Sequence, residues 1–259
     1  MINQSLKKKV TSNKLTIGSW ITIGNPSIPE IMSQADFEFL VIDIQHGIIN
    51  INQVQDMIMA IESFNITPLV RVTSNNVGLI AQCMDAGAYG VIVPLVNNKS
   101  DAIDAVKSTK YPPDGNRSTG LARAQGYGFQ FDQYKKNANK FSTVIVQIEH
   151  KDSIENIEEI LSVNDIDGYM IGPYDLSASM NKSYHDMDHG EIERIEKDVI
   201  SVAKKNNKIA GYHIVHPDKN IIKNKIKMGY RFIVVGSDNI YLGNSCINTM
   251  NDLKGILWE

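Results

Sequence analysis

The sequence predicts a single α/β domain built as a (β/α)8 TIM barrel, and three observations support this prediction. Short apolar segments alternate with longer amphipathic segments eight times along the chain. The short segments form nearly unbroken apolar runs, as expected for parallel strands that are buried on both faces. The chain has 259 residues, which is a normal length for one such barrel, and no segment of low complexity divides it.

The predicted strands and helices follow one another in a regular order. Strands are expected at residues 15–23, 37–44, 67–72, 90–96, 143–149, 168–172, 208–214 and 232–236. Between them, apolar residues recur every three or four positions, as in Ile51, Val54 and Ile58, which is the period of an amphipathic helix. The helices expected from this pattern span residues 51–64, 77–86, 101–108, 153–161, 191–206, 218–228 and 238–258. Such alternation implies parallel strands joined by right-handed crossovers.

Composition and charge exclude several classes of protein. Residues 1–14 are predicted to be a solvated N-terminal extension that carries a run of three lysines, and residues 15–259 are predicted to form the barrel domain. The net charge of −3 gives no electrostatic reason to expect binding to nucleic acid or to a membrane surface. The two cysteines, Cys83 and Cys246, form no CxxC pair and fit a cytoplasmic protein. No apolar stretch reaches the ~20 residues of a membrane span.

One connection is longer than a compact barrel needs. Residues 111–128 contain Arg117, Arg123 and several glycines between two predicted elements. Long loops within a compact domain are commonly functional. We predict that this loop lies near the mouth of the barrel and serves either the site or the assembly. A surface excursion is the alternative.

Polar side chains cluster at the predicted C-terminal ends of the strands, where barrels of this class place their active sites. The cluster comprises Asp43, Gln45, His46, Arg71, Gln147, Glu149, Gly172, Pro173, Tyr174, Asp175, His213 and Asp238. The guanidinium of Arg71 can bind a substrate carboxylate or pair with a nearby acid. Glu149 and Asp175 follow adjacent strands, so they can hold Mg²⁺ or Mn²⁺ or act as acid and base; Asp175 can instead cap a helix.

Several short motifs at these positions carry a family resemblance. They occur in the order Asp43-Ile44-Gln45-His46-Gly47, Pro68-Leu69-Val70-Arg71-Val72, Asp85-Ala86-Gly87-Ala88, Tyr111-Pro112-Pro113, Ala122-Arg123-Ala124, Gln147-Ile148-Glu149 and Ile171-Gly172-Pro173-Tyr174-Asp175-Leu176-Ser177. With these motifs, the segment from Ile17 to Leu242 resembles the HpcH/HpaI aldolase family, which belongs to the phosphoenolpyruvate/pyruvate superfamily of barrels.

The resemblance implies the chemistry of class II pyruvate aldolases, which make and break carbon–carbon bonds through a pyruvate enolate. His46 matches the catalytic base of the family and Asp85 the acid that orients it. Arg71 matches the arginine that binds the keto acid and stabilises the enolate. Further matches are substrate contacts at Gln147, Glu149, Gly172, Pro173, Tyr174 and Asp175 and metal ligands at Glu149 and Asp175. A dimer-based homo-oligomer or hexamer with an exchanged C-terminal helix is also implied.

Three departures from the family pattern point to one branch of it. The family commonly has Glu where this chain has Gln45, a small residue where it has Tyr174, and an apolar residue where it has His213. With these changes the chain is similar to the siderophore-pathway (staphyloferrin B) citrate synthases, acyltransferases that condense acetyl-CoA with oxaloacetate and are described as needing no metal. In that branch, His46, His213 and Glu149 would share deprotonation of acetyl-CoA and protonation of the alkoxide, in an order that stays open.

Two other functions remain as alternatives. One is a metal-dependent class II aldolase, a lyase that cleaves 4-hydroxy-2-oxo acids to pyruvate and an aldehyde. The other is a binding or scaffold protein in which the polar strand ends are inert. Loss of turnover without loss of fold in an Arg71→Ala variant would argue against the second alternative.

Overall fold

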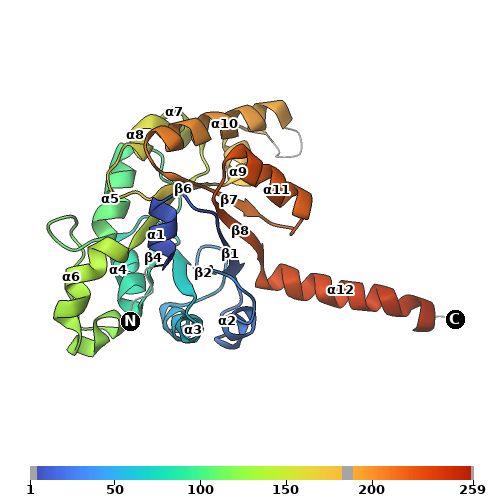
Figure 1. Ribbon diagram of the computed structural model, residues 1–259, viewed down its shortest axis with the longest axis horizontal. Helices are drawn as coiled ribbons and strands as arrows, with labels where there is room; N and C mark the ends of the chain where they lie inside the picture. Colours follow the sequence, from blue (N-terminus) through green and yellow to red (C-terminus); the bar gives the residue numbers. More distant parts are fainter. Residues whose placement is uncertain (1–4, 183–188, 258–259) are drawn as a thin grey trace.

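The computed structural model describes residues 5–182 and 189–257 and contains one closed barrel of parallel strands (Figure 1). The strands lie in chain order, each pairs in parallel with its neighbours, and β8 closes the barrel against β1. Their bounds are β1 (Thr16–Ile21), β2 (Phe39–Asp43), β3 (Thr67–Arg71), β4 (Gly90–Val93), β5 (Thr143–Ile148), β6 (Gly168–Ile171), β7 (Ile209–Ile214) and β8 (Phe232–Ser237). The predicted TIM barrel is confirmed, with every strand inside or close to its predicted range.

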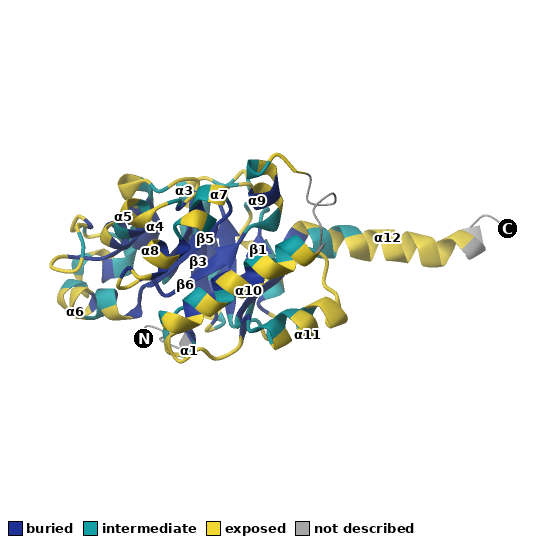
Figure 2. Ribbon diagram, turned by 90° about the horizontal axis from the view of Figure 1, so that it is seen from above, coloured by how far each residue is buried: buried dark blue, intermediate teal, exposed yellow. Residues whose placement is uncertain are grey.

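The strands form the buried centre of the molecule (Figure 2). Their outward side chains pack against the surrounding helices in one large apolar cluster, and their inward side chains form a second cluster. Within the inner cluster the rings of Phe39 and Phe232 stack with centroids 4.4 Å apart. A side chain on Gly18 would lie 2.4 Å from the ring of Phe39, so glycine is needed at this position of β1.

The surrounding helices agree with the predicted pattern where that pattern is long and periodic. They are α2 (Ser27–Met32), α3 (Ile51–Ser63), α4 (Val77–Ala86), α5 (Lys99–Thr109), α6 (Phe131–Phe141), α7 (Lys151–Glu155), α8 (Ile157–Leu161), α9 (Pro173–Ser179), α10 (His189–Lys205), α11 (Lys219–Met228) and α12 (Asp238–Leu257). The side chains of Asn50, Asn76, Asn98 and Asp218 accept backbone N–H bonds where helices begin. Residue 258, the predicted last residue of the C-terminal helix, lies outside the described residues.

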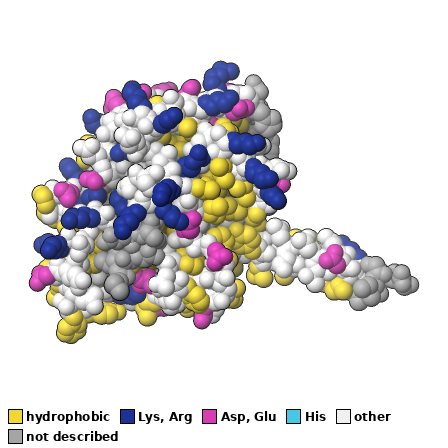
Figure 3. All heavy atoms as spheres, viewed as in Figure 1, with side chains coloured by type: hydrophobic (Ala, Val, Ile, Leu, Met, Phe, Trp, Pro, Cys, Tyr) yellow, Lys and Arg dark blue, Asp and Glu magenta, His cyan; other side chains and the backbone are white. Residues whose placement is uncertain are grey.

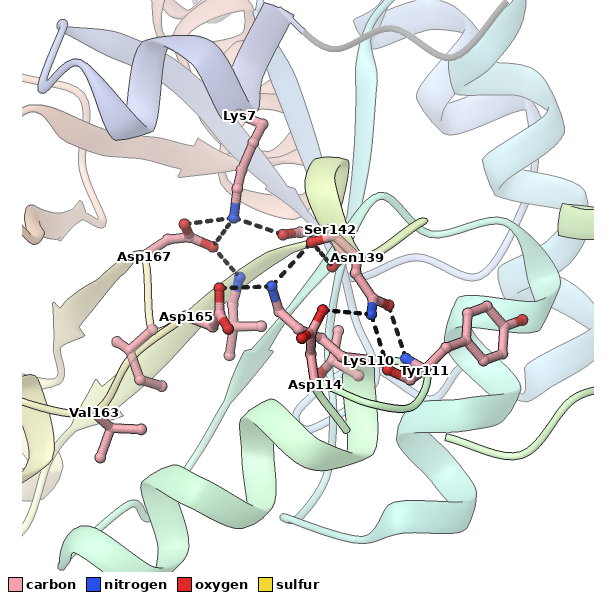
Figure 4. A network of polar contacts seen from close by, with 12 residues as sticks. Lys7, Lys110, Tyr111, Asp114, Asn139, Ser142, Val163, Asp165 and Asp167 are labelled. Carbon is pink, nitrogen blue, oxygen red and sulfur yellow. Dashed lines mark hydrogen bonds and ion pairs between the residues drawn. The ribbon is translucent and has the colours of Figure 1, made fainter. Parts of the chain in front are cut away.

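The prediction that the N-terminal lysines are solvated was wrong for Lys7. Residues Ser5–Thr11 form helix α1, whose Leu6 and Val10 are buried against the inner cluster at the N-terminal end of the barrel. The Nζ of Lys7 donates to the Asp167 carboxylate at 2.5 and 2.6 Å and to the carbonyl of Ser142 at 2.7 Å (Figure 4). The helix therefore closes the end of the barrel opposite the mouth, because its apolar face covers the open ends of the inner side chains.

The long connection also lies away from its predicted place. It follows α5, which runs antiparallel to the strands, so it starts at the N-terminal end of the barrel rather than at the mouth. There Arg117 Nη2 donates to Asp85 at 2.5 Å, and Arg123, in the 3-10 helix η1 (Arg123–Gly128), pairs with Glu62 on α3. The loop covers the C-terminal ends of α3 and α4.

Helix α12 extends away from the barrel, with most of its length exposed (Figures 1 and 2). Its exposed apolar residues are Leu242, Ile247, Met250 and Leu253. Figure 3 shows hydrophobic side chains gathered on the barrel surface beside the N-terminal end of this helix, which we call its root. Among the described helices, none combines the length and the apolar character that crossing a membrane requires.

Candidate active site at the mouth of the barrel

The guanidinium of Arg71 is held in a fixed orientation at the C-terminal ends of the strands. Arg71 is the last residue of β3 and pairs in register with Asp43, the last residue of β2. Arg71 donates from Nε and Nη2 to the two carboxylate oxygens of Asp43, at 2.9 and 2.6 Å. The side chain of Asp43 is 2% exposed and that of Arg71 is 12% exposed. This two-bond contact fixes the plane of the guanidinium, as a group that orients a substrate requires.

Trp20 and His213 line the inner side of Arg71. The guanidinium carbon of Arg71 lies 4.2 Å from the centroid of the Trp20 ring, and the His213 ring meets that ring edge-on at 5.5 Å. Burial, and then the charge of Arg71, lower the pKa of His213 to about 4, with only partial opposition from Asp43. His213 is therefore neutral at pH 7. Its buried Nε2 has no hydrogen-bond partner among the described residues.

Glu149 follows β5 and is 3% exposed. One carboxylate oxygen accepts the backbone N–H of Leu95 at 2.8 Å, and the other accepts Gln147 Nε2. Burial is the main cause that raises the pKa of Glu149; the charge of Asp175 also raises it, while the Leu95 bond and the charge of Arg71 oppose the shift. The charges of both Arg71 and Asp175 therefore act on the carboxylate of Glu149.

Asp175 lies in the first turn of α9 and is exposed. The chain reaches it through Gly172, where a Cβ would lie 2.9 Å from that of Glu149, so only glycine lets the backbone pass this close. The amide oxygen of Gln147 is buried beside Glu149 without a partner among the described residues. Two carboxylates and an unpaired amide oxygen are the donors that a hard divalent ion prefers, so these residues fit Mg²⁺ or Mn²⁺. Within the described ranges, no cluster of three or more acidic, His or Cys groups suggests another metal site.

His46 is exposed in the tight turn that follows β2, rather than on the strand itself. The turn is held by Asp43, whose Oδ1 accepts the backbone N–H groups of Gln45 at 3.0 Å and His46 at 3.3 Å. Asp43 thus fixes both the His46 turn and Arg71. This role of Asp43 was not predicted, although its place at a strand end beside an arginine was a usable signal. Trp20, at the end of β1, was missed in the same way.

The residues proposed from the sequence therefore divide between the two ends of the barrel. The structure brings Arg71, Gln147, Glu149, Gly172 and His213 to the mouth, with Asp175 and the exposed Tyr174 on the adjoining helix. Asp85, in contrast, lies at the C-terminal end of α4, where Arg117 and Gln125 donate to it. Four residues later, the N–H of Tyr89 bonds to the carbonyl of Pro68 near the start of β3, which marks the N-terminal end of the barrel.

Comparison with known proteins identifies the family. The sequence profile of the HpcH/HpaI aldolase/citrate lyase family matches residues 16–248. The chain belongs to this family. The hydroxypyruvate/pyruvate aldolase of Roseobacter denitrificans is 32% identical over 243 residues, which cover 93% of each chain.

Two solved structures of the family superpose on most of the chain. An HpcH/HpaI aldolase/citrate lyase family protein from Burkholderia cenocepacia is 27% identical, with a TM-score of 0.91 and coverage of 97% of this chain and 99% of that one. The citrate synthase SbnG is 26% identical, with a TM-score of 0.84 and the same coverage of both chains. Aldolases and a citrate synthase thus both resemble this HpcH/HpaI family member.

Proposed function

We propose that this HpcH/HpaI family protein is a carbon–carbon lyase that cleaves 4-hydroxy-2-oxo acids to pyruvate and an aldehyde, through a pyruvate enolate. The observation that carries the proposal is the position of Arg71, which is fixed by Asp43 at the same end of the barrel as Glu149 and whose charge acts on Glu149 together with that of Asp175. Removal of a proton next to a carbonyl requires stabilisation of the negative charge that develops on the oxygen. The aldolase name of the Roseobacter denitrificans relative, which matches nearly the whole chain, also supports it.

Each residue then has a stated task. Arg71 binds the keto acid and places positive charge beside the developing oxyanion. His46, exposed at the mouth, takes and returns protons, while Gln147, Pro173 and the backbone at Gly172 and Tyr174 contact the substrate. Glu149 and Asp175 hold a divalent cation. That cation, when bound, supplies Lewis-acid polarisation of the substrate carbonyl.

A second candidate is the citrate synthase that condenses acetyl-CoA with oxaloacetate for siderophore biosynthesis. Two observations favour it: the neutral, buried imidazole of His213 beside Arg71, and the similarity to citrate synthase SbnG. In this reaction Arg71 holds an oxaloacetate carboxylate. His46, His213 and Glu149 share the two proton transfers, and no metal is required. Both candidate reactions pass through an enolate and fit a cytoplasmic enzyme with small-molecule substrates.

We further propose that the protein works as a homo-oligomer, either a dimer or a hexamer, with α12 exchanged between copies. The exposed apolar residues of α12 and the hydrophobic surface beside its root support this arrangement (Figure 3). The predicted pair of His46 with Asp85 also bears on it. Because α4 carries Asp85 to the opposite end of its own barrel, such a pair requires the Asp85 of a second copy.

An activity panel with and without a chelator tests the proposed function. We expect pyruvate formation from 4-hydroxy-2-oxo acids, lost on chelation and restored by Mg²⁺ or Mn²⁺. Thiol release from acetyl-CoA and oxaloacetate that survives chelation would instead establish the synthase. The Glu149→Gln variant should lose the cleavage activity, while Glu155→Gln, on the exposed side of α7, should keep it. Absence of both activities would contradict both candidate reactions.

A further inference from the structure

The root of α12 and the catalytic turn of His46 are joined by a short chain of contacts. On β8 one extra residue is inserted relative to β1, since the pairs Gly18–Val234 and Trp20–Ser237 enclose two steps on β1 and three on β8. Gly236 takes up this bulge with a φ of 56°. A bulge re-aims the residues that follow it. Here it turns Asp238, the first residue of α12, toward the end of β1.

At the bulge, hydrogen bonds to the backbone come from side chains rather than from the regular ladder between strands. The carbonyl of Val235 accepts the hydroxyl of Ser19 at 2.7 Å and that of Tyr241 at 2.6 Å. The ring of Tyr241 also lies against Gly236, where a Cβ would come within 2.7 Å of it. The start of α12 is thus anchored to the barrel independently of Asp238.

Asp238 is 4% exposed and binds the loop that follows β1. Its carboxylate accepts the backbone N–H of Thr22 at 2.9 Å, the Thr22 hydroxyl at 2.7 Å and the backbone N–H of Ile23 at 2.8 Å. Among the described residues it forms no ion pair. Its Oδ1 also accepts the backbone N–H of the next residue, Asn239, at 2.9 Å. A buried carboxylate that accepts bonds from two consecutive residues of a loop fixes the path of that loop.

The loop in turn packs against the residue that follows His46. A Cβ on Gly47 would lie 2.9 Å from the carbonyl oxygen of Thr22, so the two backbones are in direct contact. Next along the loop, the carbonyl of Gly24 accepts Gln53 Nε2 at 2.6 Å. The His46 turn is therefore supported by Asp43 on its inner side and by the Asp238-bound loop on the other.

We propose that Asp238 is a positioning residue, which holds the His46 turn in its reactive position through Thr22 and thereby couples the root of α12 to the active site. The inference rests on the proposed function only in treating His46 as the base. A base displaced by ~1 Å can cost about 100-fold in rate even when the substitution lies away from the chemistry. Loss of the Asp238 charge should therefore lower turnover more than substrate binding.

The test is exchange of the pyruvate methyl protons with deuterium, in the full-length protein with Mg²⁺ or Mn²⁺ present. The base removes a proton from the methyl carbon, the electron pair forms the enolate, and the same carbon takes up a deuteron from solvent. Asp238→Asn should lower kcat for exchange about 10- to 100-fold, with KM for pyruvate within about twofold of wild type. The matched control is Asp252→Asn, the same charge change on the exposed part of α12, which should leave exchange unchanged.

Two further measurements separate positioning from folding and from the proposed function. Thr22→Val removes only the hydroxyl bond to Asp238 and should give an intermediate fall in kcat; if Asp238→Asn does not fold, an unchanged kcat in Thr22→Val overturns the proposal. Equal kcat in Asp238→Asn and Asp252→Asn also overturns it. If wild type shows no exchange, the proposed function fails instead. In that case the imidazole NMR signal of His46, assigned with His46→Asn, decides whether Asp238 holds the His46 turn. An unshifted signal in Asp238→Asn excludes coupling between Asp238 and that turn.

Discussion

The two ends of the barrel use polar residues in opposite ways. At the N-terminal end, Lys7 binds Asp167 and Lys110 binds Asp165 at 3.0 Å (Figure 4). Lys208 donates to two backbone carbonyls there, at 3.0 and 2.8 Å. At the mouth, buried atoms of Trp20, Gln147 and His213 have no partner among the described residues.

The difference separates stability from function within one fold. Buried polar groups are normally paired, because leaving one unpaired costs free energy. At the N-terminal end, which α1 seals, the buried lysines are paired, although the hydroxyls of Thr16 and Thr67 lack partners among the described residues. At the mouth, an indole, an amide and an imidazole keep hydrogen-bonding capacity that a ligand can use. Substitutions at the N-terminal end should therefore change the free energy of unfolding, and substitutions at the mouth should change activity.

Arg71→Lys should show the largest effect. A lysine ammonium cannot form the two-bond contact with Asp43 and still present a planar fork to the substrate. We expect kcat/KM to fall about 100-fold or more, with the fold retained in circular dichroism. Arg231→Lys is the matched control, because Arg231 donates to backbone carbonyls just before β8, at the other end of the barrel. Activity within tenfold of wild type in Arg71→Lys would contradict the assignment of function to the mouth of the barrel.

Lys7→Met should lower the stability of the protein and leave its activity unchanged, the converse of Arg71→Lys. It leaves Asp167, whose side chain is 6% exposed, without its cation. Removal of one partner of a buried pair commonly costs about 3 kcal/mol or more, so urea unfolding should show a loss of this size. The specific activity of the folded protein should not change. Lys8→Met, on the exposed side of α1, should be close to neutral, and equal losses in the two variants would contradict the role assigned to Lys7.

His213→Leu should change how the free energy of unfolding depends on pH, because the buried imidazole is neutral in the folded protein. Burial lowers the pKa of His213 from 6.5 to about 4, so the unfolded chain binds a proton there at a higher pH than the folded chain does. Wild type should therefore lose stability as pH falls from about 6.5 toward 4, by up to about 3 kcal/mol from this residue. The variant should lack this component of acid destabilisation. Parallel stability curves for the two proteins over this range would refute a buried neutral His213.

Glu149→Gln should give the smallest effect on stability, and in the favourable direction. Burial raises the pKa of Glu149, so the folded state holds this proton to a higher pH than the unfolded state. The charged carboxylate therefore disfavours folding once pH rises through the raised pKa, and the amide avoids this cost. At pH 7 the variant should be more stable by about 0.5–2 kcal/mol in thermal unfolding, while inactive. Below the usual pKa of 4.5 the advantage should disappear.

Periodic segments were predicted well and short polar ones were not. The apolar runs at residues 67–72 and 143–149 gave β3 and β5, and the period of residues 77–86 gave α4 with both ends correct. Helices α1, α2, α6 and η1 were missed because they are short, or because only a narrow stripe of each is buried. Helix α9 was considered only as a helix that Asp175 could cap. The predicted helix at 153–161 divides into α7 and α8 at Asn156.

The candidate site was predictable as a set of strand ends but not as a set of contacts. The sequence placed Arg71, Glu149 and His213 at one end of the barrel. It did not reveal that Asp43 would fix Arg71, or that Trp20 would lie beneath it. The position of Asp85 was available from topology, since a helix that follows a strand returns the chain to the opposite end of the barrel.

The barrel, its strand order and the residue types at its mouth could be predicted from the sequence, because burial on one face or two imposes a local period. The pairing of Lys7 with Asp167, the place of residues 111–128 at the N-terminal end and the bonds from Asp238 to the loop beside His46 are visible in the three-dimensional structure alone. These contacts join residues far apart in the chain. Their geometry follows from barrel closure, from the direction of each helix and from a single bulge in β8, none of which leaves a local period in the sequence.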